Sequence, residues 1–369
     1  MHPELSYQEY ETSRFVQERL KQFGIPFEVI AETGVVGTIK GKNPDKKLIA
    51  LRADMDALPI REENDIPYRS KNEGVMHACG HDVHTTCLLG AARILQELKE
   101  EWEGTVRLIF QPGEEKNPGG ASLMIRDGVL EPKPDGIFAL HVHTGLETGK
   151  MSFRGGKVMA SADELYFTIK GKGGHAASPQ VTIDPILIGS HLVLALQQAI
   201  SRRNDPFNPS VLSITAFNAG TTTNIIPEMA QLKGTFRAMD EKWRFQAHEL
   251  IRSISKGIVE GMGAQLDLHI DVGYPCVINN GKLTAIAVEK AKEFAGKEMI
   301  SETELRMGAE DFGYYAQEVP ACFFRLGTMN TEKGITSGVH TPTFNIDEDA
   351  IETGMGMMAW IGSSLIPDL

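Results

Sequence analysis

The sequence predicts an α/β protein in which a catalytic domain with a mostly parallel sheet carries an inserted α+β domain. Continuous apolar runs of strand length lie at residues 48–53, 105–110 and 136–142. Between the first two, residues 85–100 place apolar side chains at helical intervals and charged side chains on the other face. Buried strands that alternate with amphipathic helices are typical of a parallel sheet covered by helices on both faces.

The inserted domain is predicted from a change of pattern near residue 163. From there, apolar and polar residues alternate as they do in half-buried strands. The alternating segments are 164–170, 211–220, 230–240 and 264–273. Two helical segments, 185–202 and 241–261, separate them. This order predicts an antiparallel sheet with helices on one face.

The α/β pattern returns at about residue 276, with a helix near 283–294 and a strand at 321–327. We therefore expect residues 1–163 and 276–369 to form the catalytic domain and residues 164–275 to form the insertion.

The chain begins in a segment with helical spacing. Phe15, Leu20 and Phe23 lie on one face of a predicted helix over residues 8–23, which ends at Gly24. Because the helical pattern starts so close to Met1, we expect that a few upstream residues are missing from this sequence.

Composition limits the possible functions. The 369 residues, 41% of them hydrophobic and 23% charged, are enough for two packed domains. The 49 acidic and 37 basic residues give a net charge of −12, and without a basic patch this excludes binding to nucleic acid or anionic membranes. The cysteines show no disulfide spacing and no apolar run is long enough to cross a membrane, so we expect a cytoplasmic protein. They are Cys79, Cys87, Cys276 and Cys322.

Polar side chains follow the predicted parallel strands. Asp54 and Asp56 come after the first strand, Glu114 and Glu115 follow the second, and His141 lies at the end of the third. The carboxyl ends of parallel strands share one edge of the sheet. These side chains are therefore expected to face one cleft.

Several of the residues near this cleft suit a metal ion. Cys79 and His81 are two residues apart in a segment rich in small residues, and in extended or turn backbone both can reach one ion. His141 and His143 are also two apart, and either could be a ligand, with His141 nearer to the strand end. His340 lies in a rigid Gly-Val-His-Thr-Pro segment and is a further candidate.

The adjacent glutamates indicate the chemistry. Glu114 and Glu115 follow a Gln-Pro-Gly turn, where successive side chains point in different directions. One carboxylate can then bind a metal ion while the other takes a proton from water. This division of roles is what metal-assisted hydrolysis requires.

Seven segments together resemble the amidohydrolase branch of the aminoacylase and carboxypeptidase G metallopeptidase family. They are LRADMDALPI, MHACGHDVHT, FQPGEE, IKGKGGHAASP, NIIPE, MGAEDFGYY and VHTPTFNIDEDA. The resemblance implies a metallopeptidase-like catalytic domain with a lid of the dimerisation type. It implies an enzyme that hydrolyses N-acyl amino acids, such as N-acetyl amino acids, to a carboxylic acid and a free amino acid. A dipeptidase or carboxypeptidase on the same scaffold, or a metal-binding protein without activity, is the alternative.

The resemblance also implies a site with two divalent ions, which could be Mn, Zn, Ni or Co. Glu114 is the implied general base. The implied ligands are Cys79, His81, Glu115, His141 and His340.

In the inserted domain, the resemblance implies residues that contact a small-molecule substrate. His175 would stabilise the oxyanion, often in the active site of a partner subunit, which implies a homodimer or a larger homo-oligomer. Asn224 and Arg237 would hold the substrate, and Gly308 would lie near its carboxylate.

Two departures from the family pattern concern the cleft. The wider family has a His-x-Asp pair where this chain has Asp54-Met55-Asp56, so we expect Cys79 and His81 to replace the missing histidine and the two aspartates to orient ligands. Gly113 stands where the branch commonly has alanine, and we expect it to loosen the turn before the glutamates.

Overall fold

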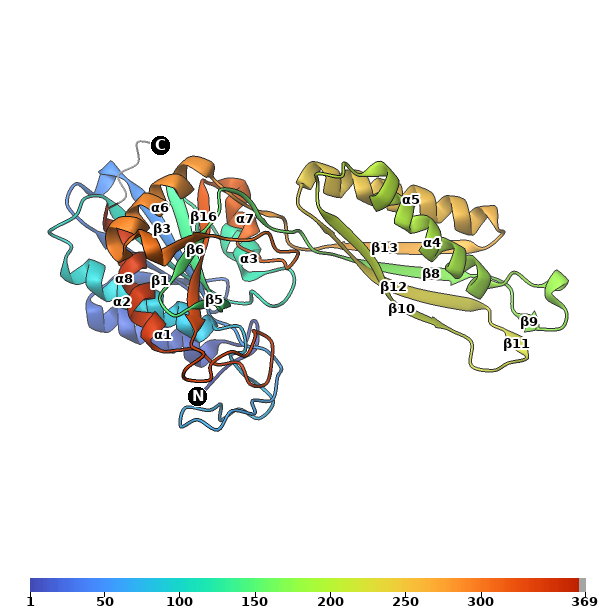
Figure 1. Ribbon diagram of the computed structural model, residues 1–369, viewed down its shortest axis with the longest axis horizontal. Coiled ribbons are helices and arrows are strands. Elements are labelled where there is room, and N and C mark those ends of the chain that lie inside the picture. Colours follow the sequence, from blue (N-terminus) through green and yellow to red (C-terminus); the bar gives the residue numbers. More distant parts are fainter. Residues whose placement is uncertain (365–369) are drawn as a thin grey trace. The chain divides into compact units, whose positions relative to one another are not determined.

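The computed structural model describes residues 1–364, which form two compact units, drawn in Figure 1. Unit 1 contains Met1–Val158, Val277–Leu305 and the described chain from Asp311 onward, and unit 2 contains Met159–Cys276 and Arg306–Glu310. The segment proposed as an insertion, 164–275, lies within unit 2, and the short segment 306–310 joins that unit from further along the chain.

Unit 1 is built on an eight-stranded sheet in the order β1-β2-β4-β3-β5-β16-β6-β15. Its strands are β1 (Phe27–Ile30), β2 (Gly34–Lys40), β3 (Leu48–Asp54), β4 (Thr105–Gln111), β5 (Gly136–Glu147), β6 (Met151–Phe153), β15 (Ile300–Glu302) and β16 (Ala321–Met329). The central strands β4, β3, β5 and β16 are parallel, whereas β1, β2 and the β16–β6 pair are antiparallel. The predicted α/β fold with a mostly parallel central sheet is confirmed.

Helices cover the sheet of unit 1 on both faces (Figure 1). They are α1 (Tyr10–Phe23), α2 (His81–Glu97), α3 (Gly120–Arg126), α6 (Gly281–Ala295), α7 (Gly313–Glu318) and α8 (Asp349–Ser364). α1, α2, α8 and α6 pack side by side, and α3 packs with α7. Leu51, Phe138 and Phe324 on the central strands are fully buried, which explains why these strands are continuous apolar runs.

The start of the chain is not helical. α1 begins at Tyr10, close to the start predicted for the helix over 8–23, whereas residues 1–9 form a turn and a single β-bridge, so the helix does not extend toward Met1. The Glu4 carboxylate instead accepts hydrogen bonds from the backbone N–H groups of Glu11 and Thr12, at 3.1 and 2.8 Å. It caps the helix from outside, because these N–H groups have no partner within the helix.

His141 does not lie at the end of its strand. β5 continues to Glu147, although β3 pairs with it only as far as Ala139. The reason is that β16 keeps pairing with β5 beyond that point, with Arg325 opposite His141. His141 therefore projects from a strand that is held on one side only.

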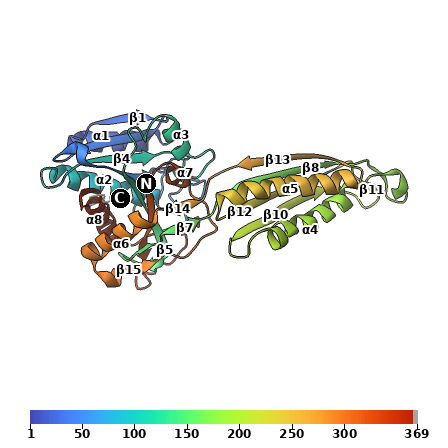
Figure 2. The same ribbon diagram turned by 90° about the horizontal axis from the view of Figure 1, so that it is seen from above.

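Unit 2 has a four-stranded antiparallel sheet in the order β10-β12-β8-β13. Its main elements are β8 (Asp163–Lys170), β10 (Ser210–Ala219), β12 (Met229–Ala238), β13 (Gln265–Val272), α4 (Pro185–Arg203) and α5 (Glu241–Gly261). α4 and α5 lie side by side on one face of the sheet (Figure 2), and Leu192 of α4 is buried in one core with Phe167 and Phe236 of the sheet. The alternation of the four strands follows from this one-sided cover.

Short elements complete the chain. They are the strand pairs β9 (Gly174–His175) with β11 (Ile225–Ile226) and β7 (Gly156–Met159) with β14 (Val277–Asn279), and the 3₁₀ turns η1 (Pro44–Lys46), η2 (Pro179–Val181) and η3 (Lys297–Met299).

A buried ionic group fastens one end of the sheet of unit 2. Asp163, the first residue of β8, accepts hydrogen bonds from Arg244 Nε at 3.0 Å and is 2.8 Å from His248 Nε2. Arg244 also donates to the carbonyl of Gly273, just after β13. Burial opposes ionisation of Asp163, but the hydrogen bonds of His248 and Arg244 outweigh it and hold the pKa of this carboxyl below its usual value.

We expect Asp163→Ala to lower the free energy of unfolding of unit 2 by about 3–5 kcal/mol, because the buried Arg244 loses its main partner. Hydrogen exchange of α5 peptides in the intact protein measures this change. Because the pKa of Asp163 is lowered by folding, its contribution is present above about pH 4, the usual pKa of aspartate, and is lost as the pH falls further. Asp267→Ala, at an exposed position of β13, is the control, and equal protection in both variants would refute the prediction.

Candidate metal centre

Five side chains from four segments of unit 1 lie close together, and we call them the donor cluster. They are Cys79, His81, Glu115, His141 and His340. Cys79 Sγ lies 3.5 Å from His141 Nε2 and 3.3 Å from His340 Nε2. His340 Nε2 lies 3.1 Å from Glu115 Oε1, which is 3.9 Å from His81 Nε2. Because Cys79 and Glu115 each approach two histidines, the five side chains form one group.

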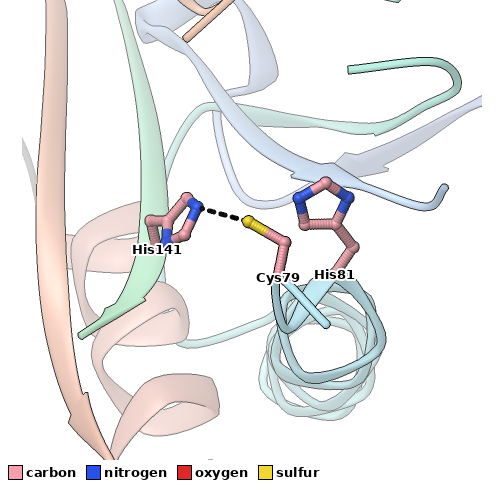
Figure 3. Close-up of side chains that lie close together, drawn as sticks. All are labelled: Cys79, His81 and His141. Atoms are coloured by element: carbon pink, nitrogen blue, oxygen red, sulfur yellow. Dashed lines mark hydrogen bonds between the residues drawn. The ribbon is translucent and has the colours of Figure 1, made fainter. Parts of the chain in front are cut away.

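A left-handed turn brings Cys79 and His81 together. Gly80 has φ +83° and precedes His81, the first residue of α2. Figure 3 shows both side chains at this end of the helix, with the sulfur directed at His141 on β5. A Cβ atom on residue 80 would lie 2.6 Å from Val142 Cγ2, so glycine is required here. Of the two backbone conformations considered for this pair, the turn is the one present.

The hydrogen bonds of His141 leave one ring nitrogen for the cluster. Nδ1 lies 2.8 Å from the carbonyl oxygen of Val142, so Nδ1 carries the proton and Nε2 faces Cys79. His143, the alternative ligand, accepts a hydrogen bond from the backbone of Gly145, and in the described chain it belongs to none of the candidate metal-binding groups. The geometry thus brings His141 and not His143 into the cluster.

Burial shifts the pKa values of two members of the cluster. Burial, with the neighbouring His84 and Arg325, lowers the pKa of His141 well below its usual value, so that its ring is neutral. Burial also raises the pKa of the Cys79 thiol to about 12. A thiolate at this position needs a neighbouring cation, and a divalent metal ion is the cation that thiolate and neutral imidazole groups bind.

His84 lies beside the cluster but has no free nitrogen. Its Nδ1 is 2.6 Å from Asp54 Oδ1, and its Nε2 accepts a hydrogen bond from the backbone N–H of Val142 at 3.0 Å. It therefore connects Asp54 to the strand that carries His141.

Asp56 holds parts of the cluster in place through its two carboxylate oxygens. Its Oδ1 atom lies 3.1 Å from His81 Nδ1 and accepts the backbone N–H of Glu114 at 3.0 Å, while Oδ2 accepts the backbone N–H of Glu115 at 3.0 Å. With Nδ1 engaged, His81 Nε2 remains buried without a hydrogen-bond partner among residues 1–364. A buried nitrogen with no partner, beside a thiol and carboxylates, fits a metal ligand.

Glu114 also lies close to the donor cluster. Its Oε2 atom lies 4.0 Å from His81 Nε2, and its Oε1 atom accepts a 3.4 Å hydrogen bond from the backbone N–H of Asp311. Only 6% of the residue is exposed. An oxygen atom of each glutamate and a ring nitrogen of His81 lie within 4.8 Å of one another, so both adjacent carboxylates face the same part of the cluster.

The sequence analysis missed a buried arginine that supports this arrangement. Arg52 is fully buried, and its guanidinium contacts Asp54 at 2.6 Å, Asp311 at 2.8 Å and Gln111 at 2.9 Å. It connects the end of β3 with the segment whose backbone holds Glu114. A single arginine within the apolar run 48–53 was the available signal, since a buried guanidinium requires acidic partners.

Two of the candidate residues in unit 2 lie together. His175 on β9 pairs with Ile225 on β11, and the backbone N–H of Ala176 donates to the carbonyl of Asn224 at 3.0 Å. His175 is exposed.

The other two lie elsewhere in unit 2. Arg237 is half-buried near the last residue of β12, where its Nε donates to Thr235 Oγ1. It is eight residues along this strand from Met229, roughly 26 Å at about 3.3 Å per residue, so it lies at the opposite end of the strand from β11. Gly308 accepts a hydrogen bond from the backbone of Ala160 at 3.1 Å.

Known proteins are similar to this chain over nearly its whole length. The model of Peptidase family M20/M25/M40 matches residues 50–361. Thermostable carboxypeptidase 2 of Saccharolobus solfataricus is 42% identical over 357 residues, which cover 95% of this chain and 89% of that protein. An N-acyl-L-amino acid amidohydrolase of Geobacillus stearothermophilus is 45% identical over 279 residues, 75% of each chain.

A solved structure gives the same result. The Bacillus subtilis YxeP protein, described as a dinuclear metal binding peptidase from the M20 family, aligns with a TM-score of 0.85 and 35% identity, over 98% of this chain and 93% of that one. The resemblance inferred from seven sequence segments is confirmed. The chain belongs to Peptidase family M20/M25/M40 and is a metal-dependent amidohydrolase.

Proposed function

We propose that the protein hydrolyses N-acyl amino acids, such as N-acetyl amino acids, to a carboxylic acid and a free amino acid. The observation that carries this proposal is a buried carboxylate, Glu114, which lies beside the donor cluster and is held by the backbone N–H of Asp311. The name of the Geobacillus stearothermophilus relative, at 45% identity, supports an N-acyl amino acid as substrate.

The proposed cofactor is a pair of divalent metal ions held by the donor cluster. Sulfur, imidazole nitrogen and carboxylate oxygen together suit Zn, Mn, Co or Ni. The dinuclear site named for the YxeP protein supports two ions. Such ions would polarise the amide carbonyl and make water more acidic. The proposed ligands are Cys79, His81, Glu115, His141 and His340.

In this proposal Glu114 moves the proton. It accepts a proton from the attacking water and gives it to the leaving amine, which requires a carboxylate that no metal ion neutralises. Asp311 holds Oε1 through its backbone N–H, so Oε2 is the atom nearer to the cluster. Asp56 keeps His81 in one orientation, and Asp54 does the same for His84.

The residues of unit 2 are proposed to contact the substrate. His175 would donate a hydrogen bond to the oxyanion, Asn224 and Arg237 would hold the substrate, and Gly308 would lie near its carboxylate. His175 lies on β9, which pairs with β11 next to the Met229 end of β12, and Arg237 lies near the other end of β12, so one small substrate is not expected to touch both within a single unit 2. This separation supports an active site that takes His175 from a second subunit.

A homodimer is accordingly proposed. β10 is an edge strand of the sheet of unit 2, and such edges pair readily with another chain. Apolar side chains near it are exposed, including Leu194 (74%) and Leu187 (52%) on α4 and Phe217 (38%) on β10. A two-fold axis beside β10 would cover both the edge and these side chains.

A cytoplasmic location is proposed from the cysteines. All four are free and buried, as in proteins kept under reducing conditions. Within residues 1–364, no helix has both the length and the apolar character needed to cross a membrane.

A carboxypeptidase or dipeptidase is the second candidate function. Thermostable carboxypeptidase 2 of Saccharolobus solfataricus, at 42% identity, favours it. The two candidates share the donor cluster and Glu114. They differ in the acyl group of the amide that is cleaved, which is a simple carboxylic acid in the first and an amino acid with a free amine in the second.

The role of Glu114 is tested by Glu114→Gln. This change keeps the size of the side chain but removes its ability to take a proton, so we expect turnover to fall about 10²- to 10⁴-fold. Metal content, measured by elemental analysis, should stay unchanged. Glu63→Gln, at an exposed position, is the control. Turnover at the wild-type level in the Glu114 variant would refute the role of general base.

The substrate class is tested with protein reconstituted with Mn, Co, Ni or Zn. We expect kcat/KM to be higher for N-acetyl, N-benzoyl or indole-acetyl amino acids than for dipeptides with a free amino terminus. A preference for dipeptides would favour the second candidate function. Inactivity with every metal and every substrate would instead indicate a metal-binding protein that has lost its activity.

The origin of His175 is tested by mixing two inactive variants, Glu114→Gln and His175→Ala, after dissociation and reassembly. If His175 acts across the dimer, half of the dimers are mixed and each has one intact site, so about a quarter of wild-type activity should return. If His175 acts within its own chain, no mixed dimer has an intact site. Equally inactive mixtures, with mixed dimers verified by mass spectrometry, would therefore exclude the shared site.

A further inference from the structure

The first residues of the chain lie against the loop that carries both glutamates. We call residues 6–9 the N-terminal strap and residues 112–120 the carboxylate loop. We propose that the strap is a positioning element of the metal centre, in which Tyr7 and Glu9 hold the carboxylate loop so that Glu114 and Glu115 reach the donor cluster together. This inference rests on the proposed function and adds residues outside the donor cluster to it.

Glu9 holds the start of the carboxylate loop. It is fully buried, and its Oε1 atom accepts the backbone N–H groups of Gly113 at 2.8 Å and Tyr7 at 2.9 Å. Its Oε2 atom accepts a hydrogen bond from Thr33 Oγ1 at 2.9 Å. The buried carboxylate thus fixes the residue before Glu114 to the body of unit 1.

Tyr7 holds the other end of the loop. Its hydroxyl donates to the carbonyl of Lys116 at 2.5 Å and accepts the backbone N–H of Gly119 at 3.0 Å. Tyr7 itself has φ +65°, a left-handed conformation that a bulky residue seldom adopts. Strain of this kind persists where the surrounding contacts maintain it, and here those contacts are to the carboxylate loop.

The ring of Tyr7 also explains Gly113. Gly113 has φ +56°, and a Cβ atom built on it would lie 2.2 Å from the ring. The expectation that this glycine loosens the turn is therefore wrong, because its missing side chain makes room for Tyr7. The loop is closed by a hydrogen bond from the backbone N–H of Gly120 to the carbonyl of Gly113 at 3.0 Å.

Ser6 connects the strap to Asp56, the aspartate that binds His81 and the backbone of both glutamates. Its hydroxyl donates to Asp56 Oδ2 at 2.6 Å, the atom that also accepts the backbone N–H of Glu115. Side chains of the strap and Asp56 thus bind backbone N–H groups at four positions of the loop, which are 113, 114, 115 and 119. Releasing the strap should loosen a metal ligand and the general base without removing either.

The test uses Tyr7→Phe and Glu9→Leu in the full-length protein, with Glu9→Gln as a conservative rescue and Tyr10→Phe as the matched control at an exposed position. The probe is Co²⁺, whose affinity for the metal-free protein is measured by competition with a chelator, and whose absorption spectrum reports on its ligands. Circular dichroism gives the folded fraction under the same conditions. Rates at saturating metal give kcat and KM.

We expect Tyr7→Phe and Glu9→Leu to weaken Co²⁺ binding, and to lower kcat, by about 10- to 100-fold, the usual effect of removing a group that orients metal ligands. KM should change little, because neither Tyr7 nor Glu9 is among the residues proposed to contact the substrate. Glu9→Gln should restore both, since an amide oxygen can accept from Gly113 and the amide N–H can donate to Thr33. Tyr10→Phe should equal the wild type.

Two outcomes would overturn the inference. One is wild-type Co²⁺ affinity and kcat in both Tyr7→Phe and Glu9→Leu. The other is a loss that matches the loss of folded protein, which would make the strap important for stability alone. A wild-type protein that hydrolyses no amide would refute the proposed function, while the Co²⁺ affinities of the variants would still decide the role of the strap.

Discussion

The carboxylate of Asp56 holds two members of the donor cluster, His81 and Glu115, and Glu114 as well. Its two oxygen atoms bind the ring of His81 and the backbone N–H groups of Glu114 and Glu115. One side chain therefore fixes the positions of three residues of the site. A carboxylate has only acceptor sites, and each partner of Asp56 is placed to donate. Because Asp56 is almost completely buried, water does not compete for these hydrogen bonds.

The surroundings of the cluster are rich in buried acids. Arg52 balances the charges of Asp54 and Asp311. Burying carboxylates is costly unless opposite charges compensate them. Divalent ions in the donor cluster would supply that charge, so the same ions would serve both the stability of the site and its chemistry.

Much of the fold could be predicted because the apolar pattern of each strand indicates whether one or both of its faces are buried. LIALR and TVRLIF are apolar on both faces and form central parallel strands, whereas the alternating segment DELYFTIK forms a sheet covered on one face. Long-range supports had weaker signals. Arg52 appeared as one charge within an apolar run, and Glu9 as one acid at the start of a helix, although each acts on residues distant in the chain.

The sequence by itself determined the types of side chain available for a hydrolytic metal site and their order along the chain, because a thiol, imidazoles and paired glutamates stand beside strand ends. Only the tertiary structure decided that His141 rather than His143 faces Cys79. It also decided that the first nine residues lie outside the helix and hold the carboxylate loop. The physical reason is that ligand choice depends on which ring nitrogen a neighbouring backbone group has already bound. The hydrogen bond that binds this nitrogen depends on the tertiary arrangement of strands and loops, so a local sequence pattern does not predict it.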